Sequence, residues 1–197
     1  MVEVPQSLVD RLRTVGALKE GHFRLASGKH SDRYVEKFDL LRRPLETSAV
    51  CEEIAARYRD SAIDLVVGPT TGGILLAFDI ARRLNVAAAY AERRTGGASE
   101  RAFRQGTVFT PGSRVLVVDD ILTTGGSLRE TLAALAVEPV VVVAITVLVD
   151  RSGGGVDFGV PLTSLAKLDL PAWSAEQCPL CRANVPLVQL GTSKPVH

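Results

Sequence analysis

The sequence has little of what marks secreted, membrane-spanning or nucleic-acid-binding chains. It holds three cysteines among 197 residues, which gives no dense disulfide framework and fits a reducing, cytoplasmic setting. Its longest apolar run, 140–149, is too short to cross a bilayer as a helix, and the N-terminus shows no signal peptide. The formal net charge of +1 gives no sign of a nucleic-acid or membrane partner. We therefore expect a soluble intracellular protein.

Apolar runs and helical patterns alternate along the middle of the chain. The predicted strands are 63–68, 86–92, 114–120 and 140–150, and the predicted helices between them are 74–84 and 127–136. Two earlier helices are expected near Ser7 and over Glu46–Arg59. Continuous β-branched runs suit strands that are covered on both faces. The alternation indicates right-handed crossovers and a doubly wound parallel sheet.

The segment Val115–Glu130, VLVVDDILTTGGSLRE, carries the strongest functional signal. An apolar strand ends in Asp119 and Asp120, and a turn rich in Thr, Gly and Ser leads into a helix. In open α/β sheets, ligands bind at this edge. Glycines let backbone N–H groups approach an anion, and the helix N-terminus adds positive partial charge. The pattern therefore predicts a site for a phosphorylated sugar.

Two adjacent carboxylates before an anion site need a reason. They are explained if they accept hydrogen bonds from ribose hydroxyls, or if they help to hold Mg²⁺ through water. The segment is neither a GxxxxGK[ST] loop nor a GxGxxG fingerprint. The alternative is an ordinary capped turn between strand and helix, although buried paired acids are costly without a ligand.

A second loop of the same kind follows the first predicted strand. Its sequence VVGPTTGG, Val66–Gly73, also ends a strand and opens a helix. The residues suited to hold an anion through their backbone are Thr70, Thr71, Gly72 and Gly73. Taken alone, this motif is also compatible with a tight strand-to-helix turn.

The segment Asp119–Ser127 resembles the signature of type I phosphoribosyltransferases that binds 5-phosphoribosyl-1-pyrophosphate (PRPP), and the resemblance extends over roughly 21–151. It implies an α/β fold with a twisted, mainly parallel sheet flanked by helices, and a small hood over the carboxyl ends of the strands. It also implies Mg²⁺ as cofactor, held indirectly by Asp119 and Asp120 through water or PRPP. The PRPP-binding residues that it implies are Thr70, Thr71, Gly72, Gly73, Asp119, Asp120, Ile121, Leu122, Thr123, Thr124, Gly125, Gly126, Ser127 and Lys37.

The segment 21–44 resembles the N-terminal signature of orotate phosphoribosyltransferases. The base-binding residues implied by this resemblance are Ser27, Lys29, Tyr34, Thr123 and Arg151, the last for the orotate carboxylate. The implied reaction transfers the phosphoribosyl group of PRPP to orotate, giving orotidine 5'-monophosphate and pyrophosphate in pyrimidine nucleotide biosynthesis. Two alternatives stay open: an enzyme for a purine or another base, and a PRPP-sensing regulatory protein.

The polar segment 93–106 resembles the mobile catalytic loop of these enzymes, and a loop of this length in a compact domain is usually functional or disordered. The resemblance implies catalytic roles for Arg93, Arg94 and Arg101 beside Asp119 and Asp120. It also implies a homodimer in which this loop reaches the neighbouring site. The sequence departs from the family here, because its loop contains neither Lys nor His.

The length suits one phosphoribosyltransferase domain over 1–197. Its expected parts are a hood from about 20–40 plus the C-terminal region, a core of about 45–152, and a tail of 161–197. Within the hood, His22 and His30 are interpreted as turn or hydrogen-bonding residues.

The tail contains one CxxC pair, Cys178 and Cys181. A tetrahedral structural zinc site needs about four ligands, and the partners considered from the sequence are Cys51 and His197. Three interpretations stay open: zinc, a redox pair, and a turn with two reduced thiols.

Overall fold

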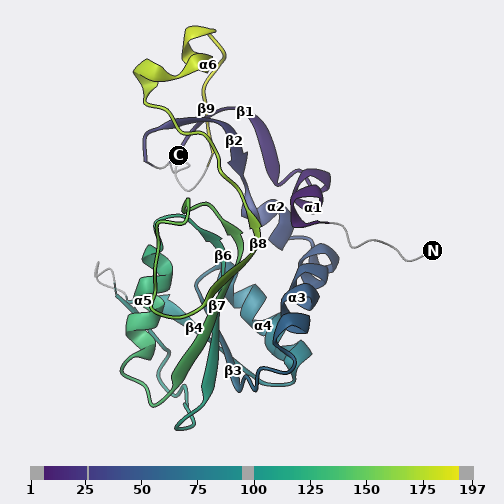
Figure 1. Cartoon of the computed structure of the whole chain (residues 1–197), viewed down its shortest axis with the longest axis vertical. Coiled ribbons are helices and arrows are strands. Elements are labelled where there is room, and N and C mark those ends of the chain that lie inside the picture. The colour runs from purple at the N-terminus through teal and green to yellow at the C-terminus, as the bar shows by residue number, and fades with distance from the viewer. Residues whose placement is uncertain (1–6, 26, 95–99, 191–197) are drawn as a thin grey trace, which may run out of the picture. The chain divides into compact units, whose positions relative to one another are not determined.

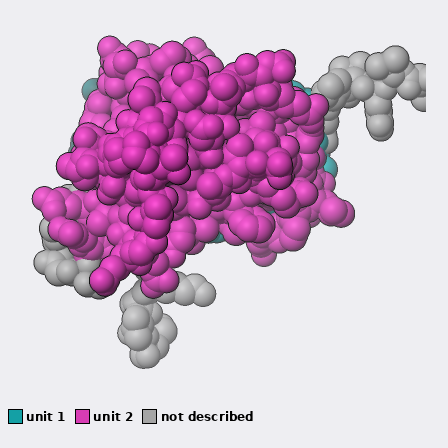
Figure 2. All heavy atoms as spheres, turned by 90° about the horizontal axis from the view of Figure 1, so that it is seen from below, with its two compact units in different colours: residues 1–40, 169–197 teal, residues 41–168 magenta. Residues whose placement is uncertain are grey.

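The computed structural model describes residues 7–25, 27–94 and 100–190. They form two compact units, which Figure 2 colours separately: a first unit of 1–40 with 169–197, and a second unit of 41–168. Each is described by itself below. That they work as a single domain, with the first unit as its hood, stays a prediction. Within the described ranges, no helix is both long and apolar enough to span a membrane.

The second unit is built on a six-stranded sheet of order β5-β4-β3-β6-β7-β8. Its strands are β3 (Leu65–Pro69), β4 (Ala87–Arg93), β5 (Arg101–Ala102), β6 (Arg114–Leu122), β7 (Val141–Asp150) and β8 (Leu162–Lys167). All neighbours pair in parallel except β5, which runs antiparallel to β4. The predicted mainly parallel sheet is therefore confirmed.

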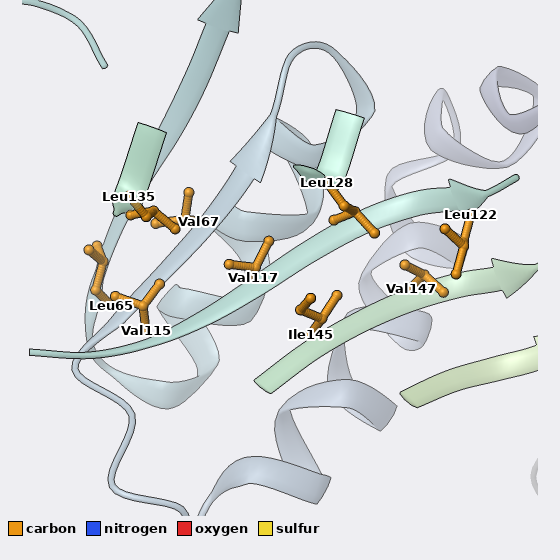
Figure 3. Packing of buried hydrophobic residues seen from close by; sticks show 9 residues of the cluster. All are labelled: Leu65, Val67, Val115, Val117, Leu122, Leu128, Leu135, Ile145 and Val147. Atoms are coloured by element: carbon orange, nitrogen blue, oxygen red, sulfur yellow. The ribbon is translucent and has the colours of Figure 1, made fainter. Parts of the chain in front are cut away.

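Helices cover both faces of this sheet (Figure 1). They are α3 (Pro44–Tyr58), α4 (Gly72–Leu84) and α5 (Gly126–Leu135). The side chains of α5 pack on strand residues of one face, and the cluster in Figure 3 consists of Leu65, Val67, Val115, Val117, Leu122, Leu128, Leu135, Ile145 and Val147. Because β6 is buried continuously from Val115 to Asp120, both of its faces are covered. That burial explains its unbroken apolar sequence.

The strand β8 lies beyond the point where the sequence pattern weakens. It pairs in parallel with β7, from Ile145 opposite Leu162 to Asp150 opposite Lys167. Its residues are half-buried or exposed, because an edge strand contacts only one neighbour. A short, partly polar sequence is sufficient at such a position, which is why no strand was predicted there.

The first unit holds α1 (Leu8–Thr14), β1 (Leu18–Arg24), β2 (His30–Val35), the start of α2 (Lys37–Leu41), a 3-10 turn η1 (Ala175–Gln177), α6 (Pro179–Arg182) and β9 (Val188–Gln189). Strand β1 pairs antiparallel with β2 and parallel with β9. The predicted helix start is confirmed, because the Ser7 hydroxyl caps α1 by accepting a hydrogen bond from the Asp10 backbone N–H at 3.2 Å.

The thiol of Cys51, buried in α3, is expected to be inert in the folded protein. Burial, and then the charge of Asp79, raise the pKa of Cys51 to about 12, and only a thiolate attacks alkylating reagents. Alkylation at neutral pH, followed by peptide mass spectrometry, should leave Cys51 unmodified in the native protein and modify it in denaturant. Equal rates in both states would contradict this.

Candidate functional site

The two acids predicted to bind ligand lie at the carboxyl end of β6 and are buried. Asp119 is 6% exposed and Asp120 is 2% exposed. One Asp119 oxygen accepts from the Ser127 hydroxyl at 2.7 Å, and the other accepts from the Asp120 backbone N–H at 2.8 Å. Asp119 is thus fixed to the first turn of α5, so the strand end and the helix start form one rigid group.

Asp120 contacts the start of the other predicted loop. Its Oδ1 accepts from the Ile121 backbone N–H at 2.7 Å. Its Oδ2 faces Gly72, where an added Cβ would lie only 1.9 Å away. Gly72 is the first residue of α4, and the positive end of a helix dipole favours a nearby carboxylate. The structure therefore brings the two predicted loops together at Asp120.

The turn between β6 and α5 presents polar groups to solvent. Thr123, Thr124 and Gly126 are exposed. Gly125 has φ of +81°, and a Cβ there would lie 2.9 Å from the ring of Phe158, so this turn requires glycine. No side chain caps the N-terminus of α5. Hydroxyls and uncapped N–H groups together form a suitable anion site.

The loop Thr70–Gly73 joins β3 to α4. The peptide bond between Thr70 and Thr71 is cis. A Cβ on Gly68 would lie 2.2 Å from the carbonyl oxygen of Gly73, so the two ends of the turn cross backbone to backbone. This close backbone contact between Gly68 and Gly73 requires glycine and restricts the conformation of the loop.

The side chain of Arg101 contacts this loop from β5. It is 5% exposed and pairs with Glu130 of α5 at 3.1 Å. Its guanidinium also donates to Thr70 Oγ1 at 2.9 Å and to the Ala91 carbonyl at 3.0 Å. Sequence reasoning missed Glu130, since an acid within an amphipathic helix gives no signal of its own.

The other loop arginines are placed differently. Arg93, the last residue of β4, is exposed, with its Nε 3.8 Å from Glu130. Arg94 follows β4 and is also exposed. Residues 95–99 of the loop lie outside the described residues. The expectation that the loop reaches a neighbouring site stays a prediction.

Arg151 follows β7 directly and lies beside the end of β6. Its backbone N–H donates to the Leu122 carbonyl at 2.8 Å, and it is half-buried. The chain therefore places Arg151 next to the residue that precedes the hydroxyl-rich turn.

The remaining predicted residues belong to the first unit. Ser27 and Lys29 are exposed in the turn between β1 and β2. Tyr34 packs on Phe23, with ring centroids 5.8 Å apart, and Lys37 opens α2. Their roles toward base or PRPP stay predictions.

The chain is similar to known phosphoribosyltransferases. Residues 41–158 match the phosphoribosyl transferase domain family. The chain is 40% identical to an orotate phosphoribosyltransferase of Caldicellulosiruptor bescii, over 94% of this chain and 96% of that one. It is 44% identical to the Thermotoga maritima orotate phosphoribosyltransferase, over 92% and 95% of the two chains.

A solved structure shares the fold. The crystal structure of orotate phosphoribosyltransferase from Aeropyrum pernix superposes with a TM-score of 0.71 at 31% identity, covering 82% of this chain and 93% of that chain. With the family match and the two full-length relatives, this establishes that the chain belongs to the orotate phosphoribosyltransferase family.

Proposed function

We propose that this protein transfers the 5-phosphoribosyl group of PRPP to orotate, giving orotidine 5'-monophosphate and pyrophosphate. The observation that carries the proposal is the buried pair Asp119 and Asp120, which lies directly before an exposed hydroxyl-rich turn and an uncapped helix end. The family membership and the similarity to two orotate phosphoribosyltransferases support the same reaction.

In the proposed reaction, the acceptor nitrogen forms a bond to C1 of the ribose as the bond from C1 to the pyrophosphate oxygen breaks. The nitrogen's proton is released to water. Positive charge grows on the ribose and negative charge on the leaving group. The protein therefore acts by positioning and by electrostatic stabilisation.

The two loops divide this work. Asp119 and Asp120 accept hydrogen bonds from the ribose hydroxyls, and the turn Thr123–Ser127 binds the 5'-phosphate at the N-terminus of α5. The loop Thr70–Gly73 binds pyrophosphate through its backbone. Arg101 donates a hydrogen bond to Thr70 Oγ1 and so helps to hold this loop in place, while Glu130 offsets its charge.

The acid pair also fits Mg²⁺. Mg²⁺ prefers oxygen ligands and keeps several waters, and both oxygens of Asp119 already accept hydrogen bonds within the protein. Asp119 and Asp120 would therefore hold the ion through water or through PRPP. When bound, Mg²⁺ supplies positive charge that neutralises pyrophosphate.

We propose that Arg151 recognises the base. The base-binding roles of Ser27, Lys29 and Tyr34 stay predictions. A guanidinium can donate two parallel hydrogen bonds to the orotate carboxylate. We further propose that the enzyme works in the cytoplasm as a homodimer, with loop 93–106 of each subunit reaching the other's site.

The direct test follows orotate consumption by ultraviolet absorbance with purified protein, PRPP and Mg²⁺. Adenine, hypoxanthine, guanine and uracil are run beside it. Orotate turnover that requires Mg²⁺ supports the proposal. Turnover of another base alone would replace orotate as acceptor, and no turnover of any base would favour a PRPP-sensing protein.

Replacing Arg151 by alanine is expected to raise KM for orotate roughly tenfold to a hundredfold, because a charge-assisted hydrogen bond contributes about 1.5–3 kcal/mol. KM for PRPP should change little. Steady-state kinetics with each substrate varied in turn measures both. Arg59→Ala, which removes an exposed arginine from the end of α3, is the control. An unchanged KM for orotate in Arg151→Ala would remove this residue from base recognition.

A further inference from the structure

Four metal-binding side chains converge inside the first unit. His22 lies on β1 and His30 opens β2, while Cys178 precedes α6 and Cys181 lies within it. One ligand atom from each residue lies within 4.8 Å of all the others. The pairing of β1 with β2 brings the histidines together, and two backbone hydrogen bonds between His30 and Trp173, at 2.8 and 2.9 Å, bring the C-terminal segment to them.

We propose that His22, His30, Cys178 and Cys181 form a structural zinc site. The sequence had suggested Cys51 and His197 as partners of the CxxC pair. Cys51 instead lies in α3 of the second unit, and His197 lies outside the described residues. The histidines that complete the set come from the other end of the chain.

The distances agree with a tetrahedron around one ion. Zn–N bonds of about 2.0–2.1 Å and Zn–S bonds of about 2.3 Å place ligand atoms about 3.3–3.8 Å apart. The two imidazole nitrogens, His22 Nε2 and His30 Nδ1, are 3.0 Å apart. The sulfur-to-nitrogen distances are 3.2 Å from Cys181 to His30, 3.4 Å from Cys178 to His22, and 3.7 Å from Cys181 to His22. These four distances lie within about 0.3 Å of the tetrahedral range. The other two pairs are no more than 4.8 Å apart, so the side chains need to close by at most about 1 Å to bind the ion.

The hydrogen bonding of His22 leaves its ligand atom ready. Its Nδ1 lies 2.8 Å from the Val185 carbonyl oxygen, which can only accept, so Nδ1 carries the proton. Nε2 then has one lone pair, and it faces His30 and both cysteines. One lone pair cannot accept three hydrogen bonds well, whereas a cation shared by all four atoms satisfies each of them. Metal-binding histidines commonly use the other nitrogen in this way.

The ligand set selects the metal. Two thiolates and two imidazoles favour Zn²⁺ over Mg²⁺ or Ca²⁺, which prefer oxygen. Two thiolate charges cancel the charge of the ion, which suits a site where His22 is 2% exposed and Cys178 is 0% exposed. Four protein ligands leave no open coordination position, so the role is structural.

Apart from the hydrogen bonds that join it to β1 and His30, the described part of the C-terminal segment has little buried surface to hold it. Between residues 169 and 190, Cys178 alone is buried, and the longest element there is the four-residue helix α6. Small units of fewer than about 70–80 residues commonly depend on a metal or disulfides. Zinc would fasten this segment to the β1–β2 hairpin.

The first experiment measures metal in the untagged, full-length protein by inductively coupled plasma mass spectrometry. One zinc per chain is expected. Chelation followed by Co²⁺ should produce thiolate-to-cobalt charge transfer and the visible bands of tetrahedral cobalt. Chelation should also shift the fluorescence emission of Trp173, the single tryptophan of the chain, because its backbone is hydrogen-bonded to that of His30. Protein without zinc that gives no thiolate-cobalt absorption would overturn the proposal.

Variants then identify the ligands. Cys181→Ser and His30→Gln are each expected to lower zinc affinity by more than about a hundredfold, since losing even an outer partner of a zinc ligand costs about 10–100-fold. Cys51→Ala is the matched control and should keep its zinc. If Cys181→Ser and His30→Gln keep zinc as tightly as the control, the ion lies elsewhere. The cobalt spectrum is also measured on the chelated wild-type protein, so the proposal can be tested even if a variant misfolds.

Discussion

Replacing Asp120 by asparagine is expected to lower kcat/KM for PRPP about a hundredfold to a thousandfold, the loss found when one preorganised group that stabilises transition-state charge is removed. Positive charge develops on the ribose in the proposed reaction, and a buried carboxylate stabilises it strongly because little water screens the interaction. Asparagine keeps the shape of the side chain and its carbonyl oxygen but removes the charge. The fold should therefore survive.

The measurement is the orotate assay with PRPP varied, combined with thermal unfolding of each variant. Asp60→Asn, which removes an exposed aspartate just after α3, is the control and should keep full activity. A folded Asp120→Asn protein with more than half of the wild-type kcat/KM would show that the charge of Asp120 does not act in the reaction. Normal activity with a lowered melting temperature in Asp120→Asn would mean that the charge of Asp120 stabilises the fold and does not act in the reaction.

The sequence was most informative where burial imposes the same demand on every residue of a strand. β6 is covered on both faces, so its apolar run had to be unbroken, and the acids at its end stood out against that run. The capped start of α1 was readable for a similar reason, because Ser7 and Asp10 satisfy a local rule. Features that depend on neighbours in sequence were therefore predictable.

Features that depend on contacts between segments far apart in the sequence could not be predicted. His22 and His30 look like ordinary turn residues until β1 and β2 pair and the C-terminal segment adds Cys178 and Cys181. Arg101 belongs by sequence to a polar loop, yet an antiparallel pairing of β5 with β4 buries it against Thr70. In both cases hydrogen bonds between separate segments choose the partners, and no local pattern records that choice.

Replacing Gly72 by alanine is expected to lower kcat/KM for PRPP at least about tenfold, through Asp120. The new methyl group would lie 1.9 Å from Asp120 Oδ2 and 3.0 Å from the Leu41 side chain, so the carboxylate must turn away. Alanine favours a helix over glycine by about 1 kcal/mol, so α4 itself is not weakened, while overpacking costs about 1–3 kcal/mol. The orotate assay and thermal unfolding separate the two effects.

Gly155→Ala is the matched control, because a methyl group there meets no atom closer than 3.7 Å and should leave activity unchanged. The decisive comparison is the double variant Gly72→Ala with Asp120→Asn. If alanine at position 72 acts by displacing the carboxylate, it has little left to remove once the charge is gone, and the two losses will not add. Fully additive losses would mean that the methyl group acts on the pyrophosphate loop directly. The charge of Asp120 would then act independently of the residue at position 72.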